Sequence, residues 1–400
     1  MVFLNFAAHG HTNPTLPLVS ELVSRGHTVI YYSMPEFREK IEAAGAEFRV
    51  YGPNFDDLKR FRYERLSGLI RVLMEAAQRI MRTLPAVLER EAPDCLIHDA
   101  FAPWGRFLGD FLNVPAVSLV TTFAFNRKSL KHSSGVVALP QFIFGIPDFI
   151  IGLSLQKKLE KQFTTRTLSL TDAFMNKEAL NIVFTSAEFH PHRELFDDSY
   201  RFVGPSFAGR AESREEVIPA GETRPLVYIS LGTMRDRPRV FFEQCFQALA
   251  DLPVVVVMSV GQDNRIDDFT DVPDNFILKN YVPQLALLKR TAVFITHCGM
   301  NSVHEALSEG VPLVAVPQTA EQALVADQVV KTGAGIRLRN ITPEAIRHAV
   351  TRLLHDAEIR AACRRLGDSL LSAGGSVRAA DEIQEYLRRG RQRSTPMAGL

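Results

Sequence analysis

The chain of 400 residues contains little cysteine and no excess of charge of either sign. Its four cysteines, Cys95, Cys245, Cys298 and Cys363, lie far apart, which disfavours a disulfide framework or a zinc site. Because 46 basic residues oppose 45 acidic ones, the net charge is +1, which argues against a nucleic-acid-binding surface. This cysteine usage is typical of a reducing compartment, so we predict a cytoplasmic location.

Long apolar runs are also scarce, and the main exception is the segment 135–153. Its length approaches the ~20 residues of a membrane-spanning helix, but it contains Pro140, Pro147 and Asp148. In lipid these would leave backbone groups and a charge unsatisfied. We therefore expect no stable membrane insertion and interpret the segment as an apolar wall of a substrate cleft, with ordinary buried packing as the alternative. The apolar stretch from Val2 has no basic leader ahead of it.

Two common nucleotide-binding signatures are missing. After the first apolar stretch only Gly10 occurs, so there is no Gly-x-Gly-x-x-Gly motif of a nicotinamide or flavin enzyme. A Walker phosphate loop is absent as well. These absences disfavour a dehydrogenase and a P-loop enzyme.

The first half of the chain alternates short apolar strands with helix-period segments. A helix is predicted at 13–25, with Pro14 in its first turn and Gly26 just past its end. Alternation of this kind is typical of a doubly wound parallel sheet. Strands are predicted at 2–7, 28–33, 47–51, 95–98, 116–120 and 182–185.

The second half repeats this scheme after a polar stretch at 206–224, which is predicted to be an exposed linker. Its strands are predicted at 226–230, 254–259, 276–278, 293–296 and 313–316. With 46% hydrophobic residues the chain can bury two cores. We predict an α/β fold of two Rossmann-like, doubly wound parallel-sheet domains facing each other across a ligand cleft.

The domain boundaries follow from this pattern. An N-terminal acceptor-binding domain is assigned to 1–205, and a C-terminal nucleotide-sugar-binding domain to 225–375. A helix is predicted at 376–389, for which a return to the N-terminal domain is one option. The basic end, 390–400, is expected to be a disordered tail.

The richest motif begins where an apolar strand ends at His297. A turn containing Gly299 follows, and then a helix whose first turn holds Asn301 and Ser302. Backbone N–H groups and the positive end of the helix dipole at such a turn favour a phosphate. Glu305, one turn further on, is suited to accept hydrogen bonds from ribose hydroxyls.

Glu321 and Gln322 follow the next strand, where a sugar would be held. The whole stretch is therefore interpreted as a nucleotide-sugar site. Ser302 and Glu305 also fit a Ser-x-x-Glu helix-capping box, and both roles stay open at this point.

A candidate general base lies near the N-terminus. His11 is predicted just before a helix start, whose positive end should keep the imidazole neutral and able to accept a proton. Asp99 follows the strand at 95–98, and the first and fourth strands of a doubly wound sheet are neighbours. Asp99 can therefore orient His11 and stabilise its imidazolium. His9 is the alternative to His11 as the base, and His98 is the alternative to Asp99 as the residue beside it. Asp99 could instead cap a helix.

Six segments together resemble the UDP-glycosyltransferase family (family 1, GT-B fold), in particular its macrolide-type bacterial branch. They occur in the family order and span nearly the whole chain, at 4–14, 93–99, 202–205, 230–233, 281–284 and 294–322. The resemblance implies that His11 is the base and Asp99 its partner. It also implies that His297 and the helix start bind the diphosphate, and that the pair at 321–322 binds the sugar.

Further donor contacts are implied by the same resemblance. Ser230, Gly232 and Thr233 follow a strand and can offer hydroxyl and N–H groups to phosphate. Val282 and Gln284 match the family segment that holds uracil and ribose.

The chain departs from the family pattern at three positions. Cys298 stands where a glycine is usual, so a backbone contact there can differ. Glu321 stands where aspartate is commoner, which leaves the sugar preference open. Tyr281 stands where plant relatives carry tryptophan.

The resulting hypothesis is an inverting, metal-independent glycosyltransferase. It would move a hexose, preferably glucose from UDP-glucose, onto a hydroxyl of an apolar small molecule such as a macrolide or phenol. No cofactor or metal is expected, since no Asp-x-Asp motif occurs and His297 with the helix start would stabilise the leaving diphosphate. The aromatic residues proposed to line the acceptor cleft are Phe101, Phe107, Phe111, Phe123, Phe125, Phe142, Phe144 and Phe149.

Three alternatives remain. One is a transferase that acts on membrane lipids or carotenoids, one a non-catalytic helper of the same fold, and one a nucleotide-sugar epimerase or hydrolase. The sequence also leaves open whether the donor nucleotide is UDP or dTDP, and whether the sugar is glucose or another hexose.

Overall fold

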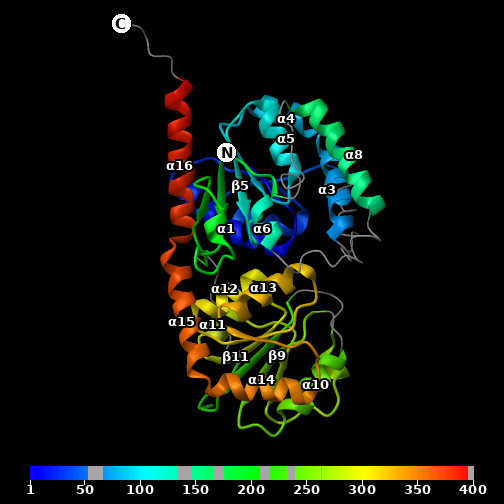
Figure 1. The fold of residues 1–400 in the computed structure, drawn as a ribbon, viewed down its shortest axis with the longest axis vertical. Helices are drawn as coiled ribbons and strands as arrows, with labels where there is room; N and C mark the ends of the chain where they lie inside the picture. Colours follow the sequence, from blue (N-terminus) through cyan, green and yellow to red (C-terminus); the bar gives the residue numbers. More distant parts are fainter. Residues whose placement is uncertain are drawn as a thin grey trace. The chain divides into compact units, whose positions relative to one another are not determined.

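The computed structural model describes residues 1–52, 66–132, 146–164, 175–207, 217–232, 239–262 and 264–394 (Figure 1). The chain divides into two compact units. The first comprises Met1–Gly209 with Ala373–Leu400, and the second Arg210–Ser372. Each unit is built on one parallel sheet, which confirms the predicted α/β class with two doubly wound domains.

The described part of the first unit forms a seven-stranded sheet of order β3-β2-β1-β4-β5-β6-β7. Its strands are β1 Val2–Leu4, β2 Ile30–Ser33, β3 Glu47–Val50, β4 Leu96–Asp99, β5 Ala116–Val120, β6 Leu180–Val183 and β7 Tyr200–Phe202. The expected pairing of the first and fourth strands is confirmed, because β1 lies parallel to β4 with Leu4 opposite His98. Since parallel strands end at the same edge of a sheet, the residues that follow β1, β4 and β5 gather there.

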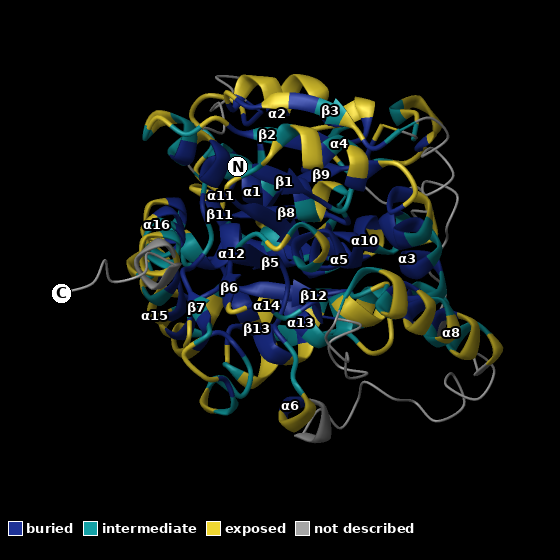
Figure 2. Ribbon diagram, turned by 90° about the horizontal axis from the view of Figure 1, so that it is seen from above, coloured by how far each residue is buried: buried dark blue, intermediate teal, exposed yellow. Residues whose placement is uncertain are grey.

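Helices cover both faces of this sheet, and its central strands β1, β4, β5 and β6 are buried (Figure 2). One apolar core includes residues of α1, α2 and α16, and a second includes residues of α3, α4 and α5. The C-terminal helix joins the first core through Ala379, Ala380 and Ile383. The helices are α1 His9–Ser24, α2 Arg38–Ala43, α3 Leu66–Ile80, α4 Leu84–Glu91, α5 Pro103–Leu112, α6 Arg127–His132, α8 Ile146–Phe163 and α16 Gly375–Ser394.

Helix α1 begins four residues earlier than predicted. Ala8 is its extended N-cap, and the carbonyl of Ala8 accepts the N–H groups of His11 (3.0 Å) and Thr12 (2.8 Å). The predicted start was Asn13, with Pro14 in the first turn, but a proline lacks only its own N–H, so a helix can begin further ahead of it and carry it in the second turn. His11 therefore lies inside the first turn of α1 and not before it.

The second unit contains a six-stranded sheet of order β10-β9-β8-β11-β12-β13 in its described residues. Its strands are β8 Leu226–Ser230, β9 Val255–Ser259, β10 Phe276–Lys279, β11 Thr291–Thr296, β12 Leu313–Ala315 and β13 Gly335–Arg337. Its helices are α10 Arg239–Leu249, α11 Gln284–Leu288, α12 Met300–Ser308, α13 Ala320–Lys331, α14 Pro343–His355 and α15 Ala357–Ser372. The sequence pattern did not indicate β13, a strand of three residues.

Two predicted segments differ in part from the structure. Within the predicted linker at 206–224, Val217 and Ile218 are buried, because these apolar side chains pack and are not solvated. Helix α16 continues to Ser394, beyond its predicted end at 389.

The apolar segment at 135–153 lies outside the described residues up to 145, and its remainder opens α8. In the described part of the chain, no helix is both long and apolar enough to span a membrane.

Candidate active site

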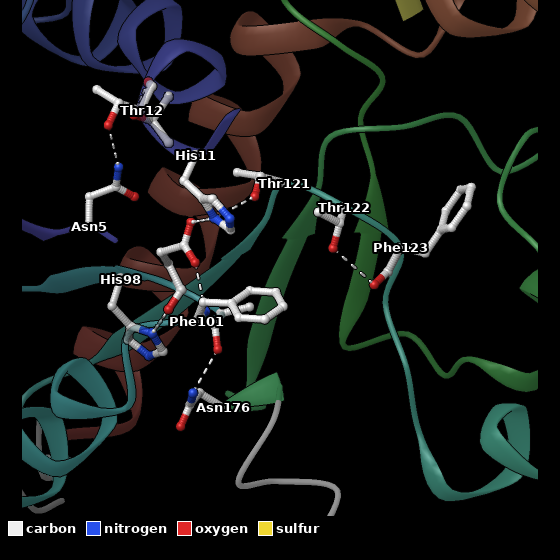
Figure 3. A network of polar contacts seen from close by, with 12 residues as sticks. Asn5, His11, Thr12, His98, Phe101, Thr121, Thr122, Phe123 and Asn176 are labelled. Carbon is white, nitrogen blue, oxygen red and sulfur yellow. Dashed lines mark hydrogen bonds and ion pairs between the residues drawn. The ribbon is translucent and has the colours of Figure 1, made fainter. Parts of the chain in front are cut away.

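The candidate base His11 lies at the carboxyl edge of the first sheet (Figure 3), where it contacts Asp99 at the end of β4. His11 Nδ1 lies 2.8 Å from Asp99 Oδ2, and the Asp99 side chain is fully buried whereas 12% of the His11 side chain is exposed. The other carboxylate oxygen of Asp99 accepts the N–H of Phe101 at 2.6 Å. Because Nδ1–H donates to Asp99, the lone pair of the neutral ring is placed on Nε2.

The local fold explains how His11 is held. Asn5, the residue after β1, donates from its side-chain amide to the Thr12 hydroxyl at 3.1 Å. The carbonyl of Asn5 accepts the Tyr51 hydroxyl at 2.8 Å, and the Thr15 hydroxyl donates to the Thr12 carbonyl at 2.9 Å. These buried contacts fasten the first turn of α1 to the end of β1.

Thr121 is a contact that the sequence reasoning missed. It directly follows β5, and its hydroxyl oxygen lies 3.0 Å from His11 Nδ1. The ring proton is therefore shared between the carboxylate and this hydroxyl. A usable signal was present, because the fifth strand of a doubly wound sheet follows the fourth in the strand order, which places the residue after the strand predicted at 116–120 next to Asp99.

Two phenyl rings bracket the His11 ring. Phe6 approaches it edge-on with a centroid distance of 5.1 Å, and Phe101 does the same at 5.2 Å. The His11 ring thus has apolar neighbours beside its polar contacts, which favours an apolar molecule as the proton donor to this base. Phe101 was predicted to lie in this region, and Phe6 was not singled out.

The other predicted cleft aromatics have different environments. Phe107 and Phe123 are core residues, and Phe125 and Phe149 pack on the edges of apolar cores. Phe111 is 39% exposed. Phe142 and Phe144 lie outside the described residues. Among the predicted aromatic residues that the structure describes, Phe101 has a ring contact with His11.

The rival assignments do not join the His11–Asp99 pair. His9 packs on the Phe37 ring at 5.0 Å, and burial together with nearby Lys40 lowers its pKa. His98 is fully buried, with its ring nitrogens 3.3 Å from the Glu178 carboxylate and 3.1 Å from the Asp99 carbonyl oxygen.

The helix-capping alternative for Asp99 is wrong. Helix α5 begins at Pro103 with Ala102 as its N-cap, and no side chain caps it.

In the second unit, the loops after β8 and β11 carry the predicted phosphate-binding residues. Ser230 ends β8, and its hydroxyl oxygen lies 3.4 Å from the N–H of Gly232, which adopts a left-handed φ of +76°. Thr233 lies outside the described residues. His297 follows β11, and Gly299 is the N-cap of α12.

Cys298, between these two residues, explains why glycine is usual at its position. Its φ is +61°, in the left-handed region that costs a residue with a Cβ about 1–2 kcal/mol. The thiol is fully buried, and burial raises its pKa to about 12. Cys298 is therefore a packing residue in a strained turn.

The proposed Ser302–Glu305 capping box is wrong, because Gly299 is the N-cap of α12 and no side chain caps this helix. Instead, the amide nitrogen of Gln284 donates to Ser302 Oγ at 3.3 Å and to Glu305 Oε2 at 2.7 Å. The Tyr228 hydroxyl donates to the other end of Gln284 at 3.1 Å. The hydrogen bonds join three predicted donor-site residues, Gln284, Ser302 and Glu305, in one network. Within it, Glu305 is only 3% exposed.

Of the neighbouring predicted residues, Val282 is buried and Asn301, the second residue of α12, is half-buried. Tyr281 is 68% exposed.

Gln322 and Glu321 have separate environments at the start of α13. Gln322 forms a true capping box: its N–H donates to Thr319 Oγ1 at 3.3 Å, and its Oε1 accepts the N–H groups of Gln318 (2.8 Å) and Thr319 (3.2 Å). Glu321 is exposed in the first turn. The Thr-x-x-Gln pattern that signals this cap was present in the sequence and was overlooked.

The described residues include no group of three or more His, Cys, Asp or Glu side chains arranged to hold a metal ion.

Comparison with known proteins covers the chain from end to end. Residues 243–385 match the model for the erythromycin biosynthesis protein CIII-like C-terminal domain. The uncharacterized UDP-glucosyltransferase YojK of Bacillus subtilis is 33% identical over 98% of each chain. The oleandomycin glycosyltransferase of Streptomyces antibioticus is 29% identical over 99% of this chain and 93% of its own.

A solved structure agrees with these relatives. The calicheamicin glycosyltransferase CalG4 is 32% identical, with a TM-score of 0.82 over 97% of this chain and 98% of its own. The sequence motifs, the two parallel-sheet units and these full-length relatives all lead to the same conclusion. This chain belongs to the UDP-glycosyltransferase family with the GT-B fold, in its macrolide-type bacterial branch, and is a glycosyltransferase.

Proposed function

We propose that this enzyme transfers a hexose, preferably glucose from UDP-glucose, to a hydroxyl of an apolar small molecule, with inversion and without a metal ion. The observation that carries this proposal is the His11–Asp99 pair, in which Nδ1 lies 2.8 Å from a fully buried carboxylate. Such a pair supplies a neutral, oriented imidazole that can accept a hydroxyl proton near pH 7.

The chemical step is a single displacement. The acceptor hydroxyl gives its proton to His11 Nε2 while its oxygen forms a bond to the anomeric carbon of the sugar. The bond from that carbon to the diphosphate oxygen breaks, and UDP leaves with the electron pair. Asp99 stabilises the imidazolium formed in this step, because its carboxylate already faces Nδ1. Attack from the face opposite the diphosphate inverts the anomeric centre.

The donor is assigned to the second unit. There His297 and the uncapped start of α12 would hold the diphosphate, since helix N-terminal N–H groups favour an anion. Glu321, which is exposed in the first turn of α13, is assigned to the sugar hydroxyls. The preference for UDP-glucose is supported by the name of the Bacillus subtilis relative, a UDP-glucosyltransferase.

The acceptor is assigned to the first unit. The rings of Phe6 and Phe101 beside His11 favour an aromatic or otherwise apolar molecule next to its reacting hydroxyl. Oleandomycin and calicheamicin glycosyltransferases are named for natural products, which supports an acceptor of that class.

The direct test is a product screen. UDP-glucose, other UDP-hexoses and dTDP-glucose are each incubated with phenols, macrolides and terpenoid alcohols, with and without a chelator. Mass spectrometry identifies the glycoside, and the NMR coupling of the anomeric proton gives its configuration. We expect a β-glucoside from the α-linked donor, with activity that survives chelation.

Other results would contradict the proposal. An α-glucoside would show retention, and a strict magnesium requirement would refute the metal-free step. Release of free glucose or an epimer without any transfer would favour a hydrolase or epimerase. For the donor half, Glu321→Ala should weaken UDP-glucose binding more than UDP binding, and equal losses would make Glu321 a structural residue.

A further inference from the structure

The imidazole of His297 packs against two glycines. A Cβ built on Gly232 would lie 2.6 Å from His297 Cε1 and 2.7 Å from Nε2. A Cβ built on Gly299 would lie 2.5 Å from the same Nε2. Contacts under 3.0 Å are essentially never found for real Cβ atoms, so at either position an added methyl group displaces the ring or the backbone.

The backbone accounts for only one of these glycines. Gly232 has a φ of +76°, which favours glycine regardless of its surroundings. Gly299 has φ −62° and ψ 138°, a conformation that any residue adopts. It is also the N-cap of α12, where Ser, Thr, Asp or Asn stabilises a helix by only a few tenths of a kcal/mol over Gly. No side chain caps this helix.

The sheet brings the two glycines to the same ring. They lie in the loops after β8 and β11, adjacent parallel strands in which Ser230 is opposite Thr296. His297 begins the second of these loops. A side chain enclosed in this way has few rotamers, so its nitrogens are directed before any ligand arrives.

We propose that Gly232 and Gly299 are positioning residues, which form a slot that fixes the His297 imidazole for contact with the nucleotide diphosphate. The slot follows from the distances alone, while its purpose rests on the donor role of His297 proposed above. Close approach of a phosphate to the Gly299 backbone is the rival explanation for this glycine.

The test is a double-mutant cycle between Gly299→Ala and His297→Ala, with UDP affinity measured by calorimetry and stability by thermal unfolding. Gly299→Ala alone should weaken UDP binding about 10-fold or more, because a misplacement on the order of 1 Å at a binding group is costly. The acceptor KM should not change. In the His297→Ala background, Gly299→Ala should cost no further affinity, because the ring it strikes is gone, and in stability only the N-cap preference for Gly over Ala should remain.

The outcomes separate the explanations. If Gly299→Ala weakens UDP binding equally in both backgrounds, phosphate approach explains the glycine and the slot is refuted. If thermal stability shows coupling while His297→Ala leaves UDP affinity unchanged, the slot exists but its donor role is wrong. Because stability reports on the slot without any ligand, failure of the proposed function is distinguishable from failure of the slot.

A matched control is available for Gly232. Gly333 has nearly the same φ, +77°, but a Cβ there would meet only the Ala362 methyl at 3.7 Å. Gly232→Ala and Gly333→Ala therefore carry the same backbone cost and differ in the contact with the His297 ring. Gly232→Ala should lower the thermal stability of the ligand-free protein more than Gly333→Ala does, and an equal loss would overturn the steric argument.

Discussion

Replacing Asp99 with asparagine should reverse the tautomer of the candidate base. The N–H of Phe101 donates to Asp99 Oδ1 at 2.6 Å, so an asparagine at 99 would place its oxygen there. Its NH2 group would then face His11 Nδ1, now 2.8 Å from a carboxylate oxygen. Because Nδ1 must accept from that NH2 group, the ring proton moves to Nε2, the nitrogen that should receive the acceptor proton.

The size of the effect follows from the lost charge. An imidazolium and a carboxylate with charge centres about 4 Å apart interact by about 4 kcal/mol at an effective dielectric of ~20. The Asp99 side chain is fully buried and that of His11 is 12% exposed, so screening by water is limited. A loss of about 4 kcal/mol in transition-state stabilisation lowers kcat about 10³-fold.

The assay is steady-state transfer from saturating UDP-glucose to an acceptor found in the screen, with UDP affinity measured in parallel. Asp99→Asn should lower kcat and leave UDP affinity unchanged, since the donor residues belong to the other unit. His9→Asn is the matched control, because His9 is the other histidine of the first turn and packs on Phe37. A kcat for Asp99→Asn within about tenfold of the wild type would refute the base–carboxylate reasoning.

Three further predictions concern stability and reactivity. All four cysteines are buried, and burial raises their thiol pKa values, so a thiol reagent at pH 8 should label them only after unfolding; rapid native labelling would contradict this. The free energy of unfolding of Cys298→Gly should lie within about 1 kcal/mol of that of the wild type, whereas Cys298→Val should lower it by about 2 kcal/mol or more, because the backbone φ here is +61°. Equal stability of the two variants would contradict backbone strain at this position. Burial lowers the pKa of His190 and His304 to about 3, so in the folded state both stay neutral down to acidic pH. In the unfolded state each binds a proton below pH ~6.5, and the free energy of unfolding therefore falls by about 2 kcal/mol per histidine by pH 5. His190→Gln keeps an acceptor for the Ala124 N–H, and its urea midpoint should fall less between pH 7.5 and 5 than that of the wild type; an unchanged pH dependence would contradict the assignment.

The sheet topology could be predicted from the sequence, because the alternation of strands with helices and the number of strands are sufficient to indicate a doubly wound fold. Counting strands placed β4 beside β1, and this alone brought His11 and Asp99 together from distant parts of the sequence. Family motifs added their roles, and the structure accommodates these roles. The pairing was predictable because parallel strands share one carboxyl edge.

Other features depend on geometry that a motif does not contain. Ser302 matched a cap, yet the N-cap of α12 is Gly299, three residues before it, because the turn at Gly299 sets the helix boundary. Pro14 indicated the wrong start for α1, since proline is compatible with more than one helical position. Thr121 required knowledge of which strand ends meet in space. The glycine slot around His297 required coordinates, because no spacing rule links Gly232 to His297.

The most direct measurement of the central claim is the pH profile of kcat for the wild type and His11→Ala with the same donor and acceptor. Removal of the base should lower kcat about 10²-fold or more, and the acidic limb that reports its protonation should disappear. UDP affinity should remain near that of the wild type. A His11→Ala enzyme with normal turnover and an unchanged acidic limb would show that another group takes the acceptor proton.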